Sequence, residues 1–279
     1  MSTNIPARER IVTLSQNTTA KVSYGWRPLV TSVDDLANAL HVPQVGAKDG
    51  ACITQGALVG DRRMSKNVSQ NDVMMLDIDN GMTLGDIVDK VQAAGLFAIV
   101  WTTYSHLTTH TEIAESKIVQ HSLKMDVMLD DDTETVTRVA RDYLLTVKKY
   151  DAVIAGTLEF TGRALEEGGV VFKFSHDVLP KHRILFVLET PFSFVEGGTQ
   201  AERIAEWKRQ YAGVSTALGL AYDSSCVDPA RLMYLPRVPS QEAAKNYEIS
   251  VIEGDALDPA QFVAAGAALT PAQEIAARF

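Results

Sequence analysis

The sequence predicts an α+β fold with a mixed sheet, interrupted by an inserted helical and β subdomain. A strand–helix–strand pattern runs through residues 72–104, where apolar residues change from a continuous run to helical spacing and back. A further strongly apolar strand follows at 183–188, and the pattern changes character over 107–179. These observations predict a main domain at 1–245, which contains an insertion or lid at 107–179. A C-terminal helical extension follows at 246–279.

Composition and charge limit the class of protein. The 279 residues are 46% hydrophobic and 22% charged, which is ordinary for a folded globular chain. No apolar stretch approaches the roughly 20 residues that span a bilayer, and residues 1–10 lack the apolar segment of a secretion signal. Two cysteines give no disulfide framework, so we expect a reducing cytoplasm. The net charge of -9 excludes a protein coated in basic surface but allows a local basic groove.

The elements follow from local signals, in chain order. Residues 32–40 predict a short capped helix, and 60–67 a basic loop. Residues 73–79 predict a buried strand, Thr83 to Gly95 a helix, and 96–104 a second strand parallel to the first with a right-handed crossover. The later segments predict, in order, a helix starting at 130–132, a strand at 168–174, a central strand at 183–188 ended by Pro191, a helix at 200–218, a strand at 231–235 and a helix over 260–279.

Asp77 and Asp79 are the first candidate for chemistry. Residues two apart on a strand project from the same face, so their carboxylates repel unless a cation lies between them. Oxygen ligands suit Mg²⁺ or Mn²⁺, which commonly also contact substrate phosphate. The alternative is two solvated acids where a strand meets a turn. Asp223 is a third candidate acid, although Asp, Ser and Pro around it also favour a turn, especially at Asp228.

A cationic run, Lys181-His182-Arg183, enters the central strand. Such charges at the mouth of a buried strand require an anionic partner, and a triphosphate would provide one. The alternative is a surface cluster. Alternation puts Lys181 and Arg183 on one face and His182 on the other, but both faces are flanked by apolar residues, so the pattern does not select the face of a site.

Histidines elsewhere carry weaker signals. Ser105 and His106 end the second strand of the strand–helix–strand unit, where α/β sheets commonly contact ligands, although a plain loop histidine fits equally. A zinc site built from His106, His110 and His121 is disfavoured because no cysteine is nearby and the spacing is not compact.

The order of these pieces resembles the three motifs of the archaeo-eukaryotic primase superfamily. The apolar run ending in Asp77-Ile78-Asp79, the segment 180–186 and Tyr222-Asp223 resemble an apolar Asp-x-Asp, a small-x-His and an apolar-Asp element. Residues 102–106 (TTYSH) and 223–236 (DSSCVDPARLMYLP) resemble two further sequence motifs of the primase-polymerase domains of phage and plasmid replication proteins. The resemblance covers roughly residues 62–236. It departs at Pro180, which lacks the usual hydroxyl, and in the long stretch between His106 and Pro180. The chain also lacks the zinc-binding cysteine set of some relatives.

The resemblance implies an RRM-like catalytic core and a DNA-directed nucleotidyltransferase that serves phage or plasmid replication in the cytoplasm of a bacterial or archaeal host. Two Mg²⁺ or Mn²⁺ ions would lie between Asp77, Asp79 and Asp223. The nucleotide, an NTP or dNTP, would meet His182, also a catalytic residue, and Arg183, Lys181, Ser105, His106 and Arg231. The DNA template or primer would follow Arg62, Arg63 and Lys66. The chain's end at Phe279 would allow a helicase domain or subunit.

Two other readings remain at this point. Residues 76–84 also resemble the opening motif of haloacid dehalogenase phosphatases, with Asp77 as nucleophile and Asp79 as acid. That family has Thr or Val where this chain has Gly81, and it leaves 181–183 and 223–236 unexplained. A non-catalytic replication-initiator domain that binds DNA is the third reading, disfavoured because all three acids are present.

Overall fold

The computed structural model divides the chain into two compact units of mixed α and β structure. It describes residues 5–129, 132–222 and 224–263. The first unit comprises Met1–Ile78, Leu84–Tyr104 and His182–Phe279, and the second comprises Asp79–Thr83 and Ser105–Lys181. The fold is therefore α+β. Among the described helices, none combines the length and apolar character needed to cross a membrane.

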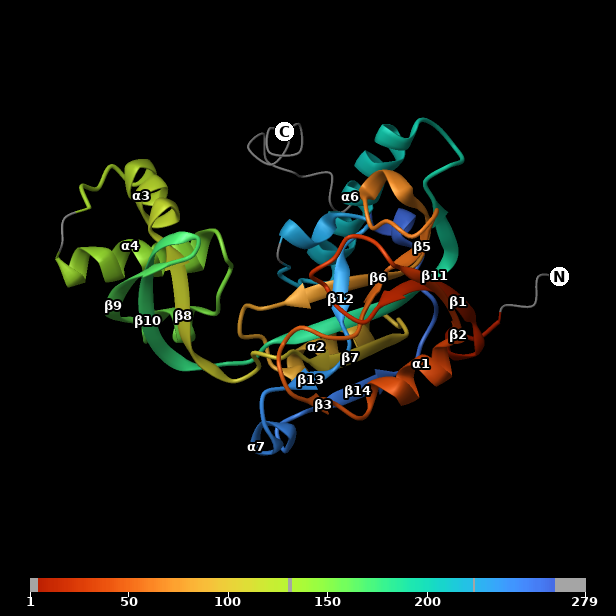
Figure 1. Cartoon of the computed structure of the whole chain (residues 1–279), viewed down its shortest axis with the longest axis horizontal. Helices are drawn as coiled ribbons and strands as arrows, with labels where there is room; N and C mark the ends of the chain where they lie inside the picture. The colour runs from red at the N-terminus through yellow and green to blue at the C-terminus, as the bar shows by residue number, and fades with distance from the viewer. Residues whose placement is uncertain (1–4, 130–131, 223, 264–279) are drawn as a thin grey trace. The chain divides into compact units, whose positions relative to one another are not determined.

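Two antiparallel sheets form the frame of the first unit (Figure 1). The five-stranded sheet has the order β14-β7-β11-β6-β5 and the four-stranded sheet the order β12-β4-β1-β2, while β13 and β3 form a short parallel pair. The strands are β1 Ile11–Asn17, β2 Arg27–Ser32, β3 Gln44–Val45, β4 Cys52–Thr54, β5 Gly56–Leu58, β6 Val68–Ile78, β7 Ala98–Thr102, β11 His182–Ser193, β12 Leu232–Tyr234, β13 Arg237–Val238 and β14 Ile249–Ile252. The helices are α1 Val33–Leu40, α2 Leu84–Ala93, α6 Gln200–Ala217 and α7 Gln241–Ala244, with 3-10 turns η1 Ala7–Glu9, η2 Ser65–Asn67, η3 Ser224–Val227 and η4 Pro259–Phe262.

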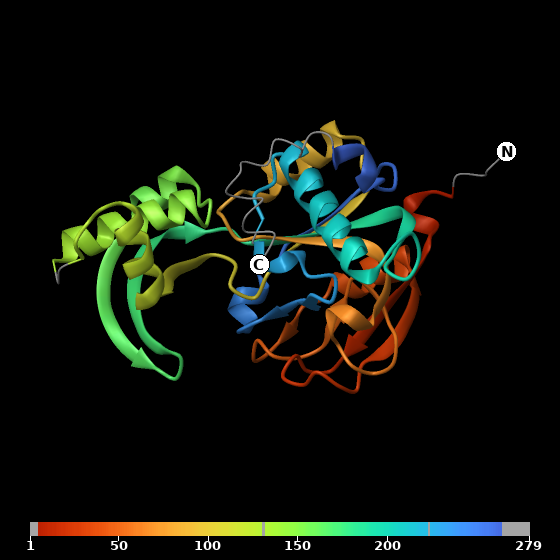
Figure 2. The same cartoon turned by 90° about the horizontal axis from the view of Figure 1, so that it is seen from above.

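Both faces of the five-stranded sheet are covered. On one face, alternate residues of β6, β7 and β11 join a core with the four-stranded sheet and α1, made in part by Met75, Trp101, Leu185, Leu14, Ile53, Leu36 and Met233. Helices α2 and α6 lie on the other side of the sheet (Figure 2). The strands are accordingly apolar on both faces, with every residue of β6 from Asn71 to Ile78 buried.

The predicted strand–helix–strand unit is present with one correction. Strands β6 and β7 each pair antiparallel with β11, so they run parallel to one another as expected, but β11 lies between them. The expected mixed sheet is therefore wrong for this sheet, in which every neighbouring pair is antiparallel. Helix α2 ends before Gly95, whose φ of +67° suits a residue without a side chain.

The helices predicted at 32–40 and 200–218 are confirmed. The Ser32 side chain accepts a hydrogen bond from the Asp35 backbone N–H at the start of α1, and Thr199 forms a capping box with Glu202 at the start of α6. Trp207, Tyr211 and Val214 supply the buried stripe of α6.

Two later segments differ from expectation. Strand β11 does not end at Pro191 but continues to Ser193, and its pairing with β6 is irregular between Val187 and Phe192. A proline can stay in such a strand because the ladder is interrupted there. The segment predicted as a helical extension, 246–279, includes β14, which pairs with β7; residues 264–279 lie outside the described residues.

The second unit is a three-stranded sheet with three helices on it. Its elements are β8 Thr108–Ala114, α3 Glu115–Lys124, α4 Thr133–Thr146, α5 Ala152–Gly156, β9 Glu159–Glu166 and β10 Gly169–Leu179, and the strand order is β8-β10-β9. Phe172, Phe174 and Ile113 pack against α3 and α4 in a separate core. The helix predicted from 130–132 begins at Thr133 with Asp132 as its N-cap, and residues 130–131 lie outside the described residues.

Candidate active site

Asp77 and Arg183 form a buried ion pair in the first unit. They lie directly opposite each other on β6 and β11, so their side chains leave the sheet on the same face. Arg183 Nε donates to Asp77 Oδ1 at 2.6 Å, and the two side chains are only 10% and 11% exposed. Opposite charge is what makes burial of either group tolerable. The alternative of a solvated acid at the end of the strand is therefore excluded for Asp77.

A third segment, far away in sequence, meets this pair. The Cys226 thiol donates to Asp77 Oδ2 at 3.5 Å. Arg183 Nη1 donates to the backbone carbonyl of Tyr234 at 2.8 Å, and the guanidinium lies 5.8 Å from the centre of the Trp101 ring. Tyr234 belongs to β12, at the edge of the four-stranded sheet. The pair therefore connects both sheets of the first unit.

The loop before β12 is held by Asp228. Its Oδ1 accepts from the Ala230 backbone N–H at 2.7 Å, as expected of an acid in a turn, and its carboxylate also accepts from the Ser65 hydroxyl at 2.8 Å. The Asp228 carbonyl accepts from the Gln55 side chain at 3.4 Å, and Arg63 Nη1 donates to the Ala230 carbonyl at 3.2 Å. Asp228 thus fixes the loop against the segments around β5, a role that its turn signal alone does not reveal.

Tyr211 is a neighbour of the site, and the sequence places it only within the helix predicted at 200–218. It is fully buried on α6 and donates from its hydroxyl to the Met75 carbonyl at 2.8 Å. Burial raises the pKa of Tyr211 well above its usual value, the nearby Asp77 carboxylate raises it further, and the Arg231 guanidinium lowers it. The only hint in the sequence is the hydroxyl on the buried side of a helix, because a buried tyrosine hydroxyl needs a hydrogen-bond partner.

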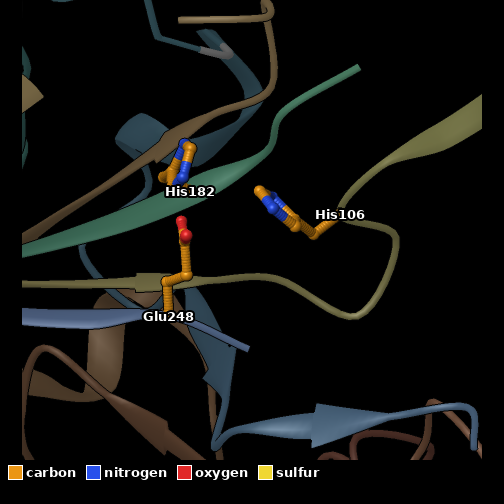
Figure 3. A group of neighbouring side chains, drawn as sticks. All are labelled: His106, His182 and Glu248. Carbon is orange, nitrogen blue, oxygen red and sulfur yellow. The ribbon is translucent and has the colours of Figure 1, made fainter. Parts of the chain in front are cut away.

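His182 lies on the opposite face of β11 from Asp77. Its register partners are Ile78 and Thr102, whereas Asp77 is opposite Arg183. The ligand atoms of His182 and of Glu248 lie within 4.8 Å of one another (Figure 3). Of the cationic run, Arg183 therefore shares the face of Asp77 and His182 does not.

The remaining predicted residues are distributed as follows. Asp79 follows β6, is partly buried and belongs to the second unit, where its charge adds to the burial that raises the pKa of Tyr150. Ser105, His106 and Lys181 also belong to that unit, and His106 Nδ1 lies 3.1 Å from the Lys181 backbone oxygen.

Asp223 lies outside the described residues, so the meeting of all three acids stays a prediction. Arg231 is partly buried, and its Nε has no hydrogen-bond acceptor among the described residues. Arg62 and Lys66 are exposed and Arg63 is partly buried, all between β5 and β6.

The Asp77 carboxylate offers the type of oxygen that hard divalent cations prefer, and in this structure both of its oxygens accept hydrogen bonds. Mg²⁺ and Mn²⁺ prefer carboxylate oxygens, and Asp77 presents two of them, one to Arg183 and one to a thiol. An ion bound there would share the carboxylate with Arg183.

Comparison with known proteins gives one structural likeness. No protein-family model matches the chain, and no curated protein matches it. Among solved structures, the AEP domain of the primase-polymerase of cyanophage S-2L is similar over 91% of this chain and 88% of that domain, with 13% sequence identity and a TM-score of 0.36.

Proposed function

We propose that this chain is a DNA primase-polymerase, which transfers nucleotides from NTPs or dNTPs to a 3′-hydroxyl on a DNA template. One observation carries the proposal. Asp77, Arg183 and the 226–234 segment belong to three stretches of sequence that resemble primase motifs, and they meet through direct hydrogen bonds. A solvated acid or an isolated turn would not require this convergence.

In this proposal the acids hold the cations and the arginines hold phosphate. Asp77, with Asp79 and Asp223, would hold Mg²⁺ or Mn²⁺, and such an ion would lower the pKa of the attacking hydroxyl and neutralise charge on the leaving pyrophosphate. Arg183 orients the Asp77 carboxylate, and the Arg231 guanidinium offers a donor to the triphosphate. Because the His182 side chain leaves β11 on the other face, we assign the main contacts with the triphosphate to Arg183 and Arg231.

The bond changes are those of nucleotidyl transfer. The 3′-oxygen gives its proton to solvent water and bonds to the α-phosphorus, while the bond from that phosphorus to the bridging oxygen breaks and pyrophosphate leaves. Arg183 sits where it can stabilise negative charge beside Asp77, and the buried setting strengthens that interaction. The described residues provide no evidence for a helicase partner, and the proposal does not include one.

The test is primer extension on single-stranded DNA with Mg²⁺ or Mn²⁺. We expect Asp77→Asn to abolish incorporation, because the amide keeps the shape of the side chain but loses the charge that binds the cation. Asp72→Asn is the matched control. Asp72 is a buried acid on the same strand, its pKa is raised by burial, and it hydrogen-bonds Thr13 and Gln70 instead of the site. This control should extend the primer as the wild type does.

Three results would overturn the proposal. Undiminished incorporation by Asp77→Asn would remove Asp77 from the chemistry. Hydrolysis of an aryl phosphate by the wild type, lost in Asp77→Asn and without any nucleotide incorporation, would favour the phosphatase reading. A wild type that binds DNA but incorporates no nucleotide with either metal would favour the non-catalytic domain.

A further inference from the structure

Two neighbouring loops of the first unit carry an unusual share of its positive charge. One loop with the first residue of β2 spans residues 18–27, and the other, between β5 and β6, spans 59–67; together we name them the paired loops. They contain Lys21, Arg27, Arg62, Arg63 and Lys66 but only one acid, Asp61, in a chain whose net charge is -9. Such a local reversal of charge marks a surface for an anionic partner.

The paired loops are fastened to each other by their backbones. The Trp26 N–H donates to the Asp61 carbonyl at 3.0 Å, and the Arg63 N–H donates to the Ser23 carbonyl at 2.7 Å. The Gly25 N–H also donates to Asp61 Oδ2 at 3.3 Å, so the single acid is already engaged. The surface is therefore preorganised, and its exposed side chains need not be gathered on binding.

An exposed aromatic ring lies among these charges. Tyr24 is 61% exposed, while the adjacent Trp26 is 2% exposed and lies 5.7 Å from the Arg63 guanidinium. Lys21, Arg27 and Arg62 are exposed as well. Trp26 and Arg63 thus build the base of the surface, and Tyr24 presents an exposed ring on the same loop as Lys21 and Arg27. Stacking faces next to backbone-tracking cations are the features by which proteins bind single-stranded nucleic acid.

The paired loops adjoin the candidate active site. Arg63 Nη1 donates to the Ala230 carbonyl at 3.2 Å, and the Ser65 hydroxyl donates to Asp228. The same short segment continues from Cys226, whose thiol contacts Asp77. An anionic strand on the paired loops would therefore lie next to the residues proposed for nucleotidyl transfer.

We infer that the paired loops bind single-stranded DNA, with a base stacked on Tyr24 and phosphates on Lys21, Arg27, Arg62 and Lys66. The identification of this strand as the template rests on the proposed function, but the binding itself does not. An anionic membrane surface is the competing partner for a basic patch, and a single exposed tyrosine with dispersed cations fits a nucleic-acid strand better than insertion into lipid.

The test measures binding of the full chain to a fluorescein-labelled dT20 strand by anisotropy, without divalent metal. Tyr24→Ala should weaken binding about tenfold, and Tyr24→Phe should keep it, because the ring and not the hydroxyl stacks. Arg62→Gln and Lys66→Gln should each lower the slope of log Kd against log salt by about 0.7. Lys245→Gln, which removes an exposed cation beside α7, is the charge-matched control and should change neither quantity.

The possible results test the DNA-binding surface and the proposed enzyme activity separately. Unchanged affinity and salt slope in the Tyr24, Arg62 and Lys66 variants would overturn it, as would binding to phosphatidylserine vesicles with none to dT20. Tighter binding of an rU20 strand would also overturn the assignment to DNA. Loss of incorporation in Asp77→Asn with dT20 binding retained supports both proposals. Binding that depends on Tyr24 in a wild type that incorporates no nucleotide supports the surface and overturns the enzyme.

Discussion

The two units of the chain treat charge in opposite ways. In the first unit, Arg183 and Asp77 are buried to about nine-tenths and held at 2.6 Å between two sheets. In the second, Lys173 of β10 lies 3.0 Å from both Glu112 and Glu166, but all three side chains are 39% to 48% exposed on the open face of the sheet. One arrangement has displaced nearly all its water, and the other remains hydrated.

The difference bears on what each ion pair is for. Removing two charges from water costs several kcal/mol per ion, and hydrophobic residues of the same size often give equal or greater stability. A buried pair is therefore weak evidence for a contribution to stability and better explained by chemistry. An exposed cluster has no such cost, so its presence on β8, β9 and β10 needs no function beyond keeping the sheet surface hydrated.

The largest expected effect comes from breaking the buried pair on one side. Arg183→Leu leaves the Asp77 carboxylate buried without its cation, and we expect a loss of about 3–5 kcal/mol in the free energy of unfolding. Trp26, Trp101 and Trp207, which are all the tryptophans of the chain, lie in the first unit, so urea unfolding followed by tryptophan fluorescence reports on that unit. The measurement is made in EDTA, so that bound metal does not contribute.

A second variant separates charge from packing. Adding Asp77→Asn to Arg183→Leu removes the stranded charge, and the double variant should recover most of the lost stability. A double variant as unstable as Arg183→Leu would mean that the bond from Arg183 to the Tyr234 carbonyl, rather than the pair with Asp77, holds the two sheets together.

Next in size is an alkaline effect that arises from burial at Tyr211. Its pKa in the folded state is well above the ordinary value near 10, so only the unfolded state ionises as the pH passes that value. Stability is fully present below pH 10 and falls above it, by about 1.4 kcal/mol per pH unit for one such tyrosine. Tyr211→Phe should cost about 1 kcal/mol at pH 7, from the lost bond to the Met75 carbonyl, and should flatten the decline.

Tyr24→Phe is the matched control for that experiment. Tyr24 is exposed, so its replacement should alter neither the stability at pH 7 nor the slope above pH 10. Equal slopes in the wild type and in Tyr211→Phe would show that Tyr211 is not responsible. A smaller slope in Tyr211→Phe alone would show that the first unit buries a second titratable group near Asp77.

Much of the fold could be predicted because its signals are local. Helix α6 follows from the spacing of Trp207, Tyr211 and Val214 and from its capping residues, and α2 from a stripe that Gly95 ends. The insertion of β11 between β6 and β7 could not be predicted, since pairing depends on residues about a hundred positions apart. The continuation of β11 through Pro191 also depends on pairing. The proline stays in the strand because it lies where the pairing of β11 with β6 is irregular.

The candidate site was predictable in residue type but not in geometry. Asp77 and Arg183 both stood out as charges at the ends of apolar strands, yet their pairing depends on the register of β6 against β11. Alternation put Arg183 and His182 on different faces but did not select one, because one face packs against the four-stranded sheet and the other lies toward α2 and α6. The sequence places Tyr211 only within a predicted helix and Asp228 only in a turn, because their partners Met75 and Ser65 are distant in sequence.

The smallest effect is expected at the exposed cluster, and it completes the contrast. The hydrogen bonds from Lys173 to Glu166 and Glu112 raise the pKa of Lys173, but solvent screens the interaction. Lys173→Met should leave the urea midpoint of the second unit unchanged within error, measured by circular dichroism in low salt and in 0.5 M NaCl. Met keeps the apolar stem of the side chain and removes only the charge. A midpoint that falls in low salt and recovers in high salt would show that Glu112 and Glu166 repel each other once Lys173 is gone, and the exposed cluster would then resemble the buried pair in being held by its cation.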